Sequence, residues 1–259
     1  MEIINESFCS GKFPDSLKVS KVIPIHKKDD HELVKNYRPV SVQNSFAKLF
    51  EIIFLRQLMN YLESSQMFNE NQFGFRKGRS TTNAIFALLS AIHSKVDALE
   101  EVLCIFYDLS KAFDLLDHNI LLNKMHILGI RGIPLKWVKS YLENRQMIVT
   151  IKHTGHDNII RKYKSSTSQL INTGVPQGSN LGPVLFLLFM NDMPDHINCG
   201  QTWLFADDVS HLINNKNKDI ALRNAQEELN GMSNWCKSNK LVLNKEKPVI
   251  LEFFNRKKT

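Results

Sequence analysis

The sequence predicts an α+β fold in which helices back an antiparallel sheet. Residues 102–107 form a continuous apolar, β-prone run that is typical of a buried strand. Residues 203–213 predict two short strands joined by a tight turn, and residues 219–237 place apolar side chains at helical spacing. Because strands and helices mix without a regular strand–helix–strand alternation, the pattern favours an antiparallel sheet.

The segments around this sheet are predicted to be mostly helical. Residues 17–28 predict a strand broken at Pro24, followed by a loop. Residues 45–63 have helical spacing, and Thr81 or Thr82 is expected to cap a helix with an inner face of Ala84, Leu88, Leu89 and Ile92. The remaining predictions are helices at 120–128, 137–142 and 183–190, a glycine-rich turn at 174–182, and extended segments at 147–151 and 248–254.

The composition is that of a globular protein with an excess of positive charge. Of 259 residues, 43% are hydrophobic and 23% charged, which excludes a disordered tail. The net charge of +7 suits a polyanionic partner. Residues 81–239 hold 15 basic and 15 acidic side chains, so the excess lies at the two ends. A neutral middle in a basic protein can contain clustered acids, and a metal site is expected there.

Cysteine usage and hydropathy predict a soluble, intracellular protein. The four cysteines lack zinc-binding spacing and are predicted to be reduced. Residues 1–10 lack the basic start and apolar stretch of a signal peptide. The longest apolar run, residues 184–190, is too short to cross a bilayer, so no membrane partner is expected. Nothing in the sequence distinguishes nucleus from cytoplasm.

Three carboxylates follow predicted strands. Asp108 ends the strand at 102–107, and Asp207 and Asp208 lie at the tip of the predicted hairpin. One acid at a turn usually bonds local backbone groups. Three converging acids suit phosphoryl transfer, in which two magnesium ions about 3.5–4 Å apart neutralise phosphate charge and activate the attacking oxygen. Since adjacent strand residues face opposite sides, Asp207 and Asp208 are not expected to contribute equally.

Six motifs resemble those of reverse transcriptases of the non-LTR retrotransposon type, in the family's order. Those similar to polymerase motifs A to D are FYDLSKAFD (106–114), GVPQGSNLGPVLF (174–186), FADD (205–208) and LNKEK (243–247). Those similar to the finger motifs are NYRPVSV (36–42) and NQFGFRKGRST (71–81). The resemblance implies a right-hand polymerase fold, with fingers in residues 1–100 and a palm in 101–259 into which finger helices partly interleave. No segment resembling a thumb follows.

The resemblance assigns the acids and the general acid. Asp108 and Asp207 would ligate two Mg²⁺ ions, with Mn²⁺ as the alternative ion, and Asp208 would support one metal or the primer end. Asp114 and Asp117 are predicted to be structural. Lys247 matches the lysine that donates a proton to the leaving pyrophosphate, although Pro248 stands where threonine is usual.

The resemblance also implies residues that bind the nucleotide. Phe113 matches the ring beneath the incoming sugar, where bulk excludes a 2′-hydroxyl; the alternative is a core phenylalanine. Gln177 and Gly178 are implied near the nucleotide and template base, because glycine permits close backbone approach. Asn180 departs from the apolar residue usual in motif B.

Basic side chains of the finger motifs are implied to bind phosphates. Arg38, and after it Lys48, would contact the triphosphate, since a guanidinium forks onto phosphate oxygens. Arg76, Lys77 and Arg79 would follow the template backbone. Surface Arg and Lys more often have no specific role, so these assignments depend on the resemblance.

The function implied is that of an RNA-directed DNA polymerase that adds deoxynucleotides to a DNA primer on an RNA template. Two alternatives remain: an inactive remnant that only binds nucleic acid, and a group II intron-type maturase. The intact acids argue against the first, and the stretch SKAFDLLDHNILL (110–122) against the second. Phe113 disfavours a third, an RNA polymerase.

Overall fold

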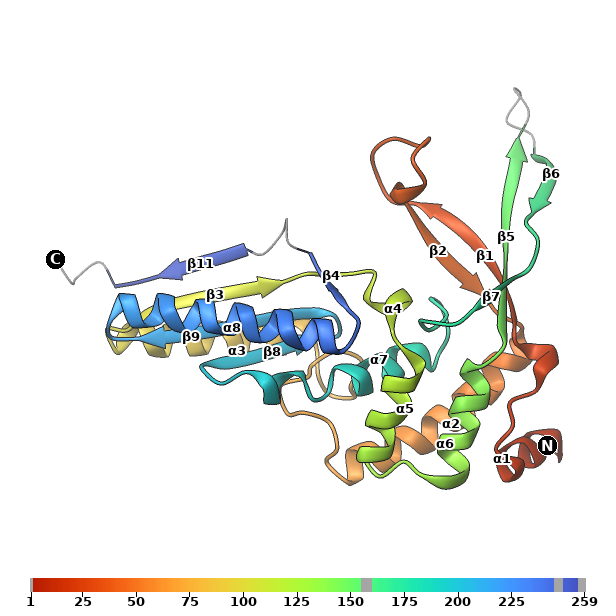
Figure 1. The fold of residues 1–259 in the computed structure, drawn as a ribbon, viewed down its shortest axis with the longest axis horizontal. Coiled ribbons are helices and arrows are strands. Elements are labelled where there is room, and N and C mark those ends of the chain that lie inside the picture. The colour runs from red at the N-terminus through yellow and green to blue at the C-terminus, as the bar shows by residue number, and fades with distance from the viewer. Residues whose placement is uncertain (1, 155–159, 245–248, 256–259) are drawn as a thin grey trace. The chain divides into compact units, whose positions relative to one another are not determined.

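The chain folds into two compact units, each built from two separate segments. The computed structural model describes residues 2–154, 160–244 and 249–255. Unit 1 comprises Met1–Tyr61 and Leu116–Leu185, and unit 2 comprises Leu62–Leu115 and Phe186–Thr259. Figure 1 shows the segments by colour along the chain. The predicted boundary between fingers and palm at residue 100 stays a prediction.

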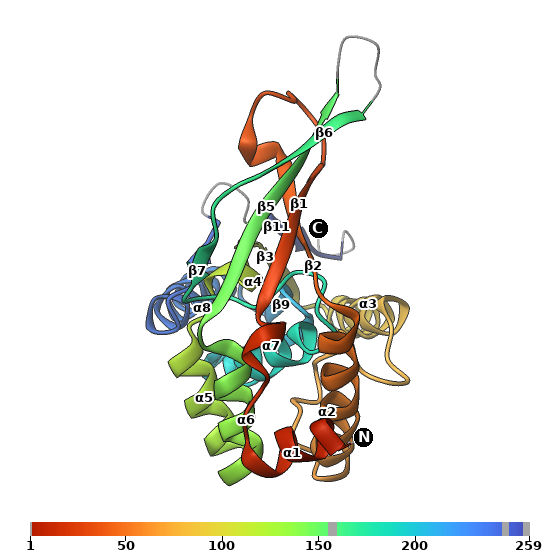
Figure 2. The same cartoon turned by 90° about the vertical axis from the view of Figure 1, so that its right-hand side faces the viewer.

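Unit 1 contains a mixed sheet with the strand order β2-β1-β5-β6, in which β7 also pairs with β5. The strands are β1 (Val19–His26), β2 (Tyr37–Val42), β5 (Arg145–Thr154), β6 (Ile160–Ser165) and β7 (Gln169–Ile171). Figure 2 shows β1 and β5 side by side. They are parallel, and the other pairs are antiparallel.

Strand β1 runs through Pro24, so the predicted break there is wrong. Pro24 lies opposite Pro39 of β2, and β1 pairs with β5 only as far as Val22. Two prolines can face each other at an antiparallel pair whose N–H positions point away from the partner strand. Among the described residues, no strand pairs with that side of β1 beyond Val22, so the N–H group that Pro24 lacks breaks no ladder there.

Aromatic side chains form the core among the helices of unit 1. These helices are α1 (Glu2–Ser10), α5 (His118–Ile127), α6 (Gly132–Leu142) and the short η1 (Asp15–Leu17) and η2 (Val34–Asn36), together with the parts of α2 (Ser45–Ser64) up to Tyr61 and of α7 (Gly182–Met190) up to Leu185. The rest of α2 and of α7 belongs to unit 2. Trp137 stacks on Phe54 with ring centroids 4.2 Å apart, and Phe13 meets Tyr141 edge-on at 5.1 Å. Burial of such rings is a major stabilising contribution.

Unit 2 contains the predicted antiparallel sheet, in the order β11-β3-β9-β8. Its strands are β3 (Glu101–Tyr107), β8 (Gln201–Phe205), β9 (Asp208–Asn215) and β11 (Val249–Phe253), and β4 (Leu109–Ser110) pairs with β10 (Val242–Leu243). Its helices are α3 (Thr81–Asp97), α4 (Ala112–Leu115), α8 (Lys218–Ser238) and the short η3 (Met193–His196).

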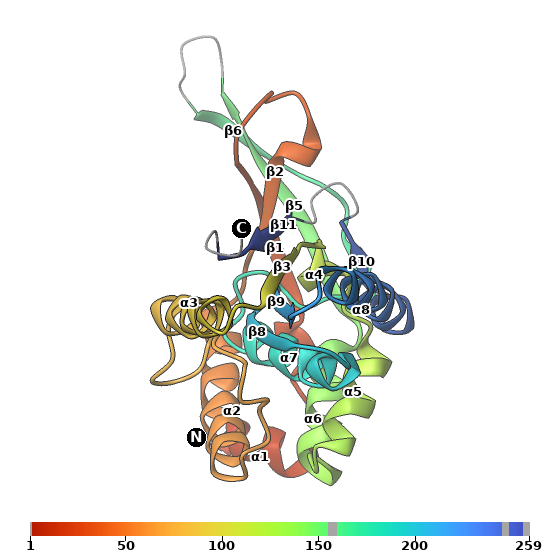
Figure 3. The ribbon, with the colours of Figure 1, turned by 90° about the vertical axis from the view of Figure 1, so that its left-hand side faces the viewer.

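Helices α3 and α8 cover the two faces of this sheet, as Figure 3 shows. Val102 and Cys104 belong to the core cluster that includes Ile92 of α3. The alternate residues Leu103 and Ile105 are buried as well, and α8 packs on β3 and β9. Consecutive strand residues face opposite sides, so burial of all four explains the unbroken apolar run in the sequence.

One cap was predicted one or two residues too late. Ser80, not Thr81 or Thr82, is the N-cap of α3, and its Oγ accepts the Asn83 N–H at 3.2 Å. Ser80 is extended, whereas Thr81 already has helical geometry. Leu89, predicted on the inner face, is exposed.

The expectations about cysteine and membrane segments can be compared with the structure. All four cysteines are free, as predicted. Burial raises the pKa of Cys104 and of Cys236 to about 11, so both thiols stay protonated. Within the described ranges, no helix combines the length and apolar character needed to cross a membrane.

Candidate active site

Three carboxylates lie at one end of the unit 2 sheet. The β8–β9 hairpin closes at the pair Phe205–Asp208, which leaves Ala206 and Asp207 as its loop. The β3–β9 ladder ends at Tyr107 opposite Val209, so Asp108 and Asp208 are the next residues on these neighbouring strands. Residues 100 positions apart in the chain are thus brought to the same strand ends.

The acids affect one another electrostatically. Burial raises the pKa of Asp207 above its usual value, and the nearby Asp208 and Asp108 carboxylates raise it further, while a hydrogen bond to its own backbone opposes them. Burial and then Asp108 likewise raise the pKa of Asp208. Neighbouring carboxylates that raise the pKa values of Asp207 and Asp208 concentrate negative charge, which a bound cation would relieve.

The donor set fits a metal that completes its coordination with substrate. In the part of the chain that the structure describes, no three His, Cys, Asp or Glu side chains are gathered closely enough to hold an ion by themselves. Magnesium usually takes one or two protein carboxylates and fills its octahedron with water and phosphate oxygens. An incomplete carboxylate site therefore suits magnesium bound together with a nucleotide.

Asn244 contacts the first of these acids, and the sequence interpretation missed it. Its backbone N–H donates to the Asp108 carbonyl at 2.9 Å, and its side-chain Nδ2 donates to Asp108 Oδ2 at 3.0 Å. Pairing of β10 with β4 brings it there, with Leu243 opposite Leu109. Asn244 belongs to the LNKEK motif, which could have indicated its role. From this motif, however, the sequence predicted a role only for Lys247, which lies outside the described residues.

Phe113 is a fixed, half-buried ring in α4. It stacks on Phe186 of α7 with centroids 4.4 Å apart and an interplanar angle of 21°. Lys111, two residues before Phe113, has φ +51°, and its carbonyl accepts the N–H groups of Asp114 and Leu115. This geometry is compatible with a sugar gate and with a core role.

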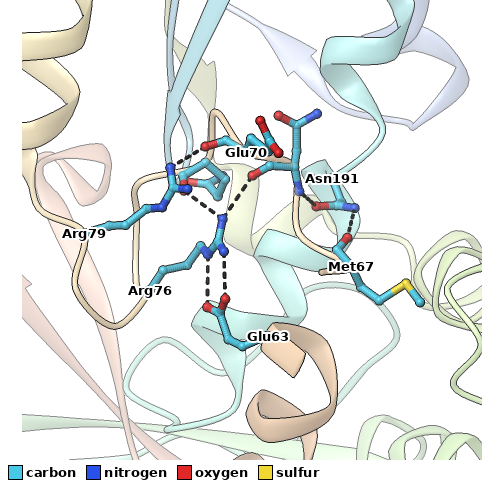
Figure 4. Close-up of polar contacts among 8 residues, drawn as sticks. Glu63, Met67, Glu70, Arg76, Arg79 and Asn191 are labelled. Carbon is cyan, nitrogen blue, oxygen red and sulfur yellow. Dashed lines mark hydrogen bonds and ion pairs between the residues drawn. The ribbon is translucent and has the colours of Figure 1, made fainter. Parts of the chain in front are cut away.

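The basic side chains of the finger motif 71–81 in unit 2 differ in their contacts. Arg76 and Arg79 form bonds within the protein (Figure 4), whereas Lys77 does not take part in those bonds. Arg76 forms a two-pronged ion pair with Glu63, with Nε–Oε1 and Nη2–Oε2 distances of 3.0 and 2.7 Å. Arg79 donates to the Glu70 carbonyl, and its guanidinium lies 4.9 Å from the Phe73 ring centroid. Burial, and then Arg76, lower the pKa of Arg79. Lys77 is exposed.

An amide side chain fixes the start of the same loop. Asn191 Oδ1 accepts the Asn69 N–H, and its Nδ2 donates to the Met67 carbonyl, both at 2.8 Å (Figure 4). Asn191 follows α7, so it ties the residues that precede the finger motif to the end of that helix. It contacts neither the acids nor the hairpin loop through these bonds.

In unit 1, the other finger motif meets motif B. The Ser41 N–H donates to the Gln177 carbonyl at 2.7 Å. Gly178 has φ +110°, and a Cβ there would lie 2.8 Å from the Ser41 carbonyl oxygen, so only glycine fits. Arg38 is exposed on the same strand, β2, and Lys48 is half-buried in the first turn of α2.

A buried carboxylate that the sequence interpretation also missed holds motif B. Glu51 of α2 is fully buried; its Oε1 accepts the Tyr141 hydroxyl at 2.8 Å and its Oε2 accepts the Asn180 N–H at 2.7 Å. These contacts lie just before α7, where a helix N-terminus favours negative charge. Glu51 stands within an apolar helical pattern, which gave no signal of this role.

The chain belongs to the reverse transcriptase family. The family model described as "Reverse transcriptase (RNA-dependent DNA polymerase)" matches residues 25–256. A probable RNA-directed DNA polymerase from transposon BS of Drosophila melanogaster is 31% identical over 248 residues, covering 92% of this chain. The RNA-directed DNA polymerase from mobile element jockey of the same organism is 31% identical over 98% of it. The resemblance to non-LTR retrotransposon enzymes is thereby confirmed.

This chain spans about a quarter of these relatives' length, 26% and 27% respectively. Among solved structures, an apo telomerase from Candida tropicalis truncated from its C-terminal domain has a TM-score of 0.63 at 16% identity, covering 92% of this chain and 51% of that one. Candida albicans telomerase bound to a fragment of telomeric RNA has a TM-score of 0.57 at 13% identity, covering all of this chain and 46% of that one. These likenesses confirm the polymerase fold.

Proposed function

We propose that this chain is the catalytic part of a retrotransposon reverse transcriptase, which adds deoxynucleotides to a DNA primer annealed to an RNA template. The observation that carries the proposal is the convergence of Asp108, Asp207 and Asp208 at one sheet end in a member of this family. Family membership supplies the class of reaction, and the acids supply a place where charge on a triphosphate can be neutralised.

The acids have unequal roles in this proposal. Asp108 and Asp207 hold two divalent ions, Mg²⁺ or alternatively Mn²⁺, and Asp208 supports one ion or the primer end. When bound, such ions neutralise phosphate charge and activate the primer 3′-hydroxyl for attack. Asn244 orients Asp108 through the bond to Oδ2.

Other side chains bind and select the nucleotide. Arg38 and Lys48 hold the triphosphate, and Gln177 and Gly178 lie along the nucleotide and template base. Phe113 excludes a 2′-hydroxyl, a role for which a ring fixed by stacking is well suited. Lys247 donates the proton to pyrophosphate.

The template contacts are assigned to the finger motif of unit 2. Lys77 is exposed and meets phosphate directly. Arg76 and Arg79 contribute positive charge from within a braced loop, since both guanidiniums already donate inside the protein. The partners are thus an RNA template, a DNA primer and deoxynucleoside triphosphates, encountered inside the cell.

Primer extension tests this proposal. The purified chain is incubated with oligo(dT) on poly(rA), dTTP and Mg²⁺, with a parallel reaction containing EDTA. Extension that requires dTTP and disappears with EDTA is expected. Binding of the primer–template without extension would contradict the proposal and support the alternative of an inactive nucleic-acid-binding remnant.

A further inference from the structure

The loop that carries Asp207 has an unusual backbone. Ala206 has φ +58°, in the left-handed region that favours glycine, and it is the first residue of the two-residue hairpin loop. An alanine in this region is strained, and it persists where surrounding contacts hold it. The residue after it is Asp207, so whatever holds Ala206 also sets the direction of that carboxylate.

Gln72 supplies such a contact. Its side chain is 1% exposed, and its Oε1 accepts the Ala206 N–H at 3.1 Å and the Gly74 N–H at 2.8 Å. Its Nε2 has no hydrogen-bond partner among the residues that the structure describes. A buried amide with an unpaired donor is destabilising, and the two hydrogen bonds that its oxygen accepts offset part of this cost.

The backbone around Gln72 is fixed to the hairpin. The Phe73 N–H donates to the Leu204 carbonyl at 2.8 Å, and the Leu204 N–H donates to the Asn71 carbonyl at 2.9 Å. A Cβ on Gly74 would lie 2.5 Å from the Ala206 nitrogen. The segment 71–74 therefore lies directly against the strand and turn that present Asp207, and its position is set by main-chain bonds.

We infer that Gln72 is a positioning residue of the active site: its amide oxygen holds the Ala206 backbone and thereby fixes the orientation of the Asp207 carboxylate. This inference rests on the proposed function. It gives the finger motif 71–81 a second role besides contact with template, since its first residues support the catalytic hairpin. A displacement of reacting groups by about 1 Å can cost about 100-fold in rate, so the support has kinetic consequences.

The decisive variant is Gln72→Met, which keeps side-chain length and removes the acceptor. It removes the unpaired Nε2 but leaves the Ala206 and Gly74 N–H groups without this acceptor, so some loss of stability is expected, and circular dichroism checks that the variant folds. The matched control is Asn191→Leu, which removes an amide that likewise holds loop backbone in unit 2 but does not touch the hairpin. Both variants are compared with the parent chain.

Two readouts are used, and one does not involve activity. Hydrogen–deuterium exchange of the Ala206 amide, without metal or nucleotide, should accelerate about tenfold in Gln72→Met and stay at the parent rate in Asn191→Leu. In primer extension, kcat should fall about tenfold in Gln72→Met with the KM for dTTP unchanged. Unchanged Ala206 exchange, or an unchanged kcat, would overturn the inference.

Gly74→Ala tests the same contact if Gln72→Met does not fold. The added methyl must push the hairpin away from segment 71–74, so the same rise in Ala206 exchange is expected, and parent-like exchange would overturn the inference. Failure of the proposed function is separately visible. A parent chain that extends no primer contradicts the polymerase assignment, whereas an active parent with an indifferent Gln72→Met contradicts only the role of Gln72.

Discussion

Two functional loops of this molecule are each held by one buried polar side chain, and the two side chains differ in charge. Gln72 of unit 2 holds the Ala206–Asp207 turn with a neutral amide oxygen, whereas Glu51 of unit 1 holds motif B with a carboxylate. At the hairpin, the Asp208 and Asp108 carboxylates already raise the pKa of Asp207, so a carboxylate in place of Gln72 would add repulsion. Motif B leads into the N-terminus of α7, where negative charge is favourable.

In each loop, the charge of the buried side chain suits its surroundings: a neutral amide lies beside the hairpin acids, and a carboxylate lies at the N-terminus of α7. Both side chains accept backbone N–H groups, which any carboxylate or amide oxygen can do. The choice between them follows from what lies next to the loop.

The largest effect is expected at the hairpin acids. Asp108→Asn or Asp207→Asn should lower kcat about 1,000-fold or more while the Kd for primer–template stays within about threefold, because each change removes a metal ligand and no phosphate contact. Asp114→Asn, a neighbouring acid predicted to be structural, is the control. Near-normal turnover in either main variant would remove that acid from the catalytic set.

In unit 1, the contact of Glu51 with motif B should contribute to the free energy of unfolding. Glu51→Ala leaves the Tyr141 hydroxyl and the Asn180 N–H unpaired inside the protein, and should lower the free energy of unfolding by about 2–4 kcal/mol. Glu51→Gln keeps one acceptor oxygen for the Asn180 N–H, and its Nε2 can donate to the Tyr141 hydroxyl oxygen, so it should cost only about 1 kcal/mol, the charge contribution at the α7 N-terminus. Urea denaturation measures both. A Glu51→Gln variant as stable as the parent would mean that the charge is irrelevant, and a variant as unstable as Glu51→Ala would mean that the hydrogen bonds contribute nothing beyond the charge.

Unit 2 should also be the acid-sensitive unit through His211. Burial lowers the pKa of this fully buried imidazole from 6.5 to about 4, so its contribution to stability is complete above pH 6.5 and is lost as pH falls from 6.5 towards 4. Between pH 7.5 and 5 the loss is about 2 kcal/mol. His211→Gln should remove that part of the pH dependence in unfolding experiments. The same slope in parent and variant would assign the acid sensitivity elsewhere.

A smaller effect concerns sugar choice. Phe113→Val should open space beneath the sugar and raise the ratio of ribonucleotide to deoxynucleotide incorporation about tenfold, while deoxynucleotide use falls less. Competing incorporation of UTP and dTTP opposite poly(rA) measures this ratio. Unchanged discrimination would leave Phe113 as a core residue packed on Phe186.

Local patterns in the sequence were sufficient to predict the sheet, the hairpin and the helices α3 and α8 of unit 2, whereas the short helices α4 and η3 were not predicted. The apolar run at 102–107 and the turn at Asp207 can be recognised locally, because a buried strand and a chain reversal each leave a pattern in a few consecutive residues. The predicted strand break at Pro24 was wrong because the effect of a proline depends on which side of its strand is paired with another strand. That information belongs to tertiary structure.

The supporting residues could not be predicted in this way. Gln72 bonds to a residue 134 positions away, and Glu51 to one 129 positions away, so nothing near either in the chain indicates its partner. Arg76 was expected to face template phosphate, yet its guanidinium is paired with Glu63. The type of a side chain suggests what it can bind, and only the fold shows whether another group already occupies it.

Counting bound metal ions tests the central claim most directly. Electron paramagnetic resonance of Mn²⁺ is recorded with the parent chain and Asp207→Asn, each with primer–template ended by a 3′-deoxynucleotide and with dTTP. The account predicts about two bound ions per parent chain and fewer in the variant, with nucleotide-dependent binding in the parent. The same number of ions in both proteins would show that Asp207 does not hold a metal and would contradict the active site described above.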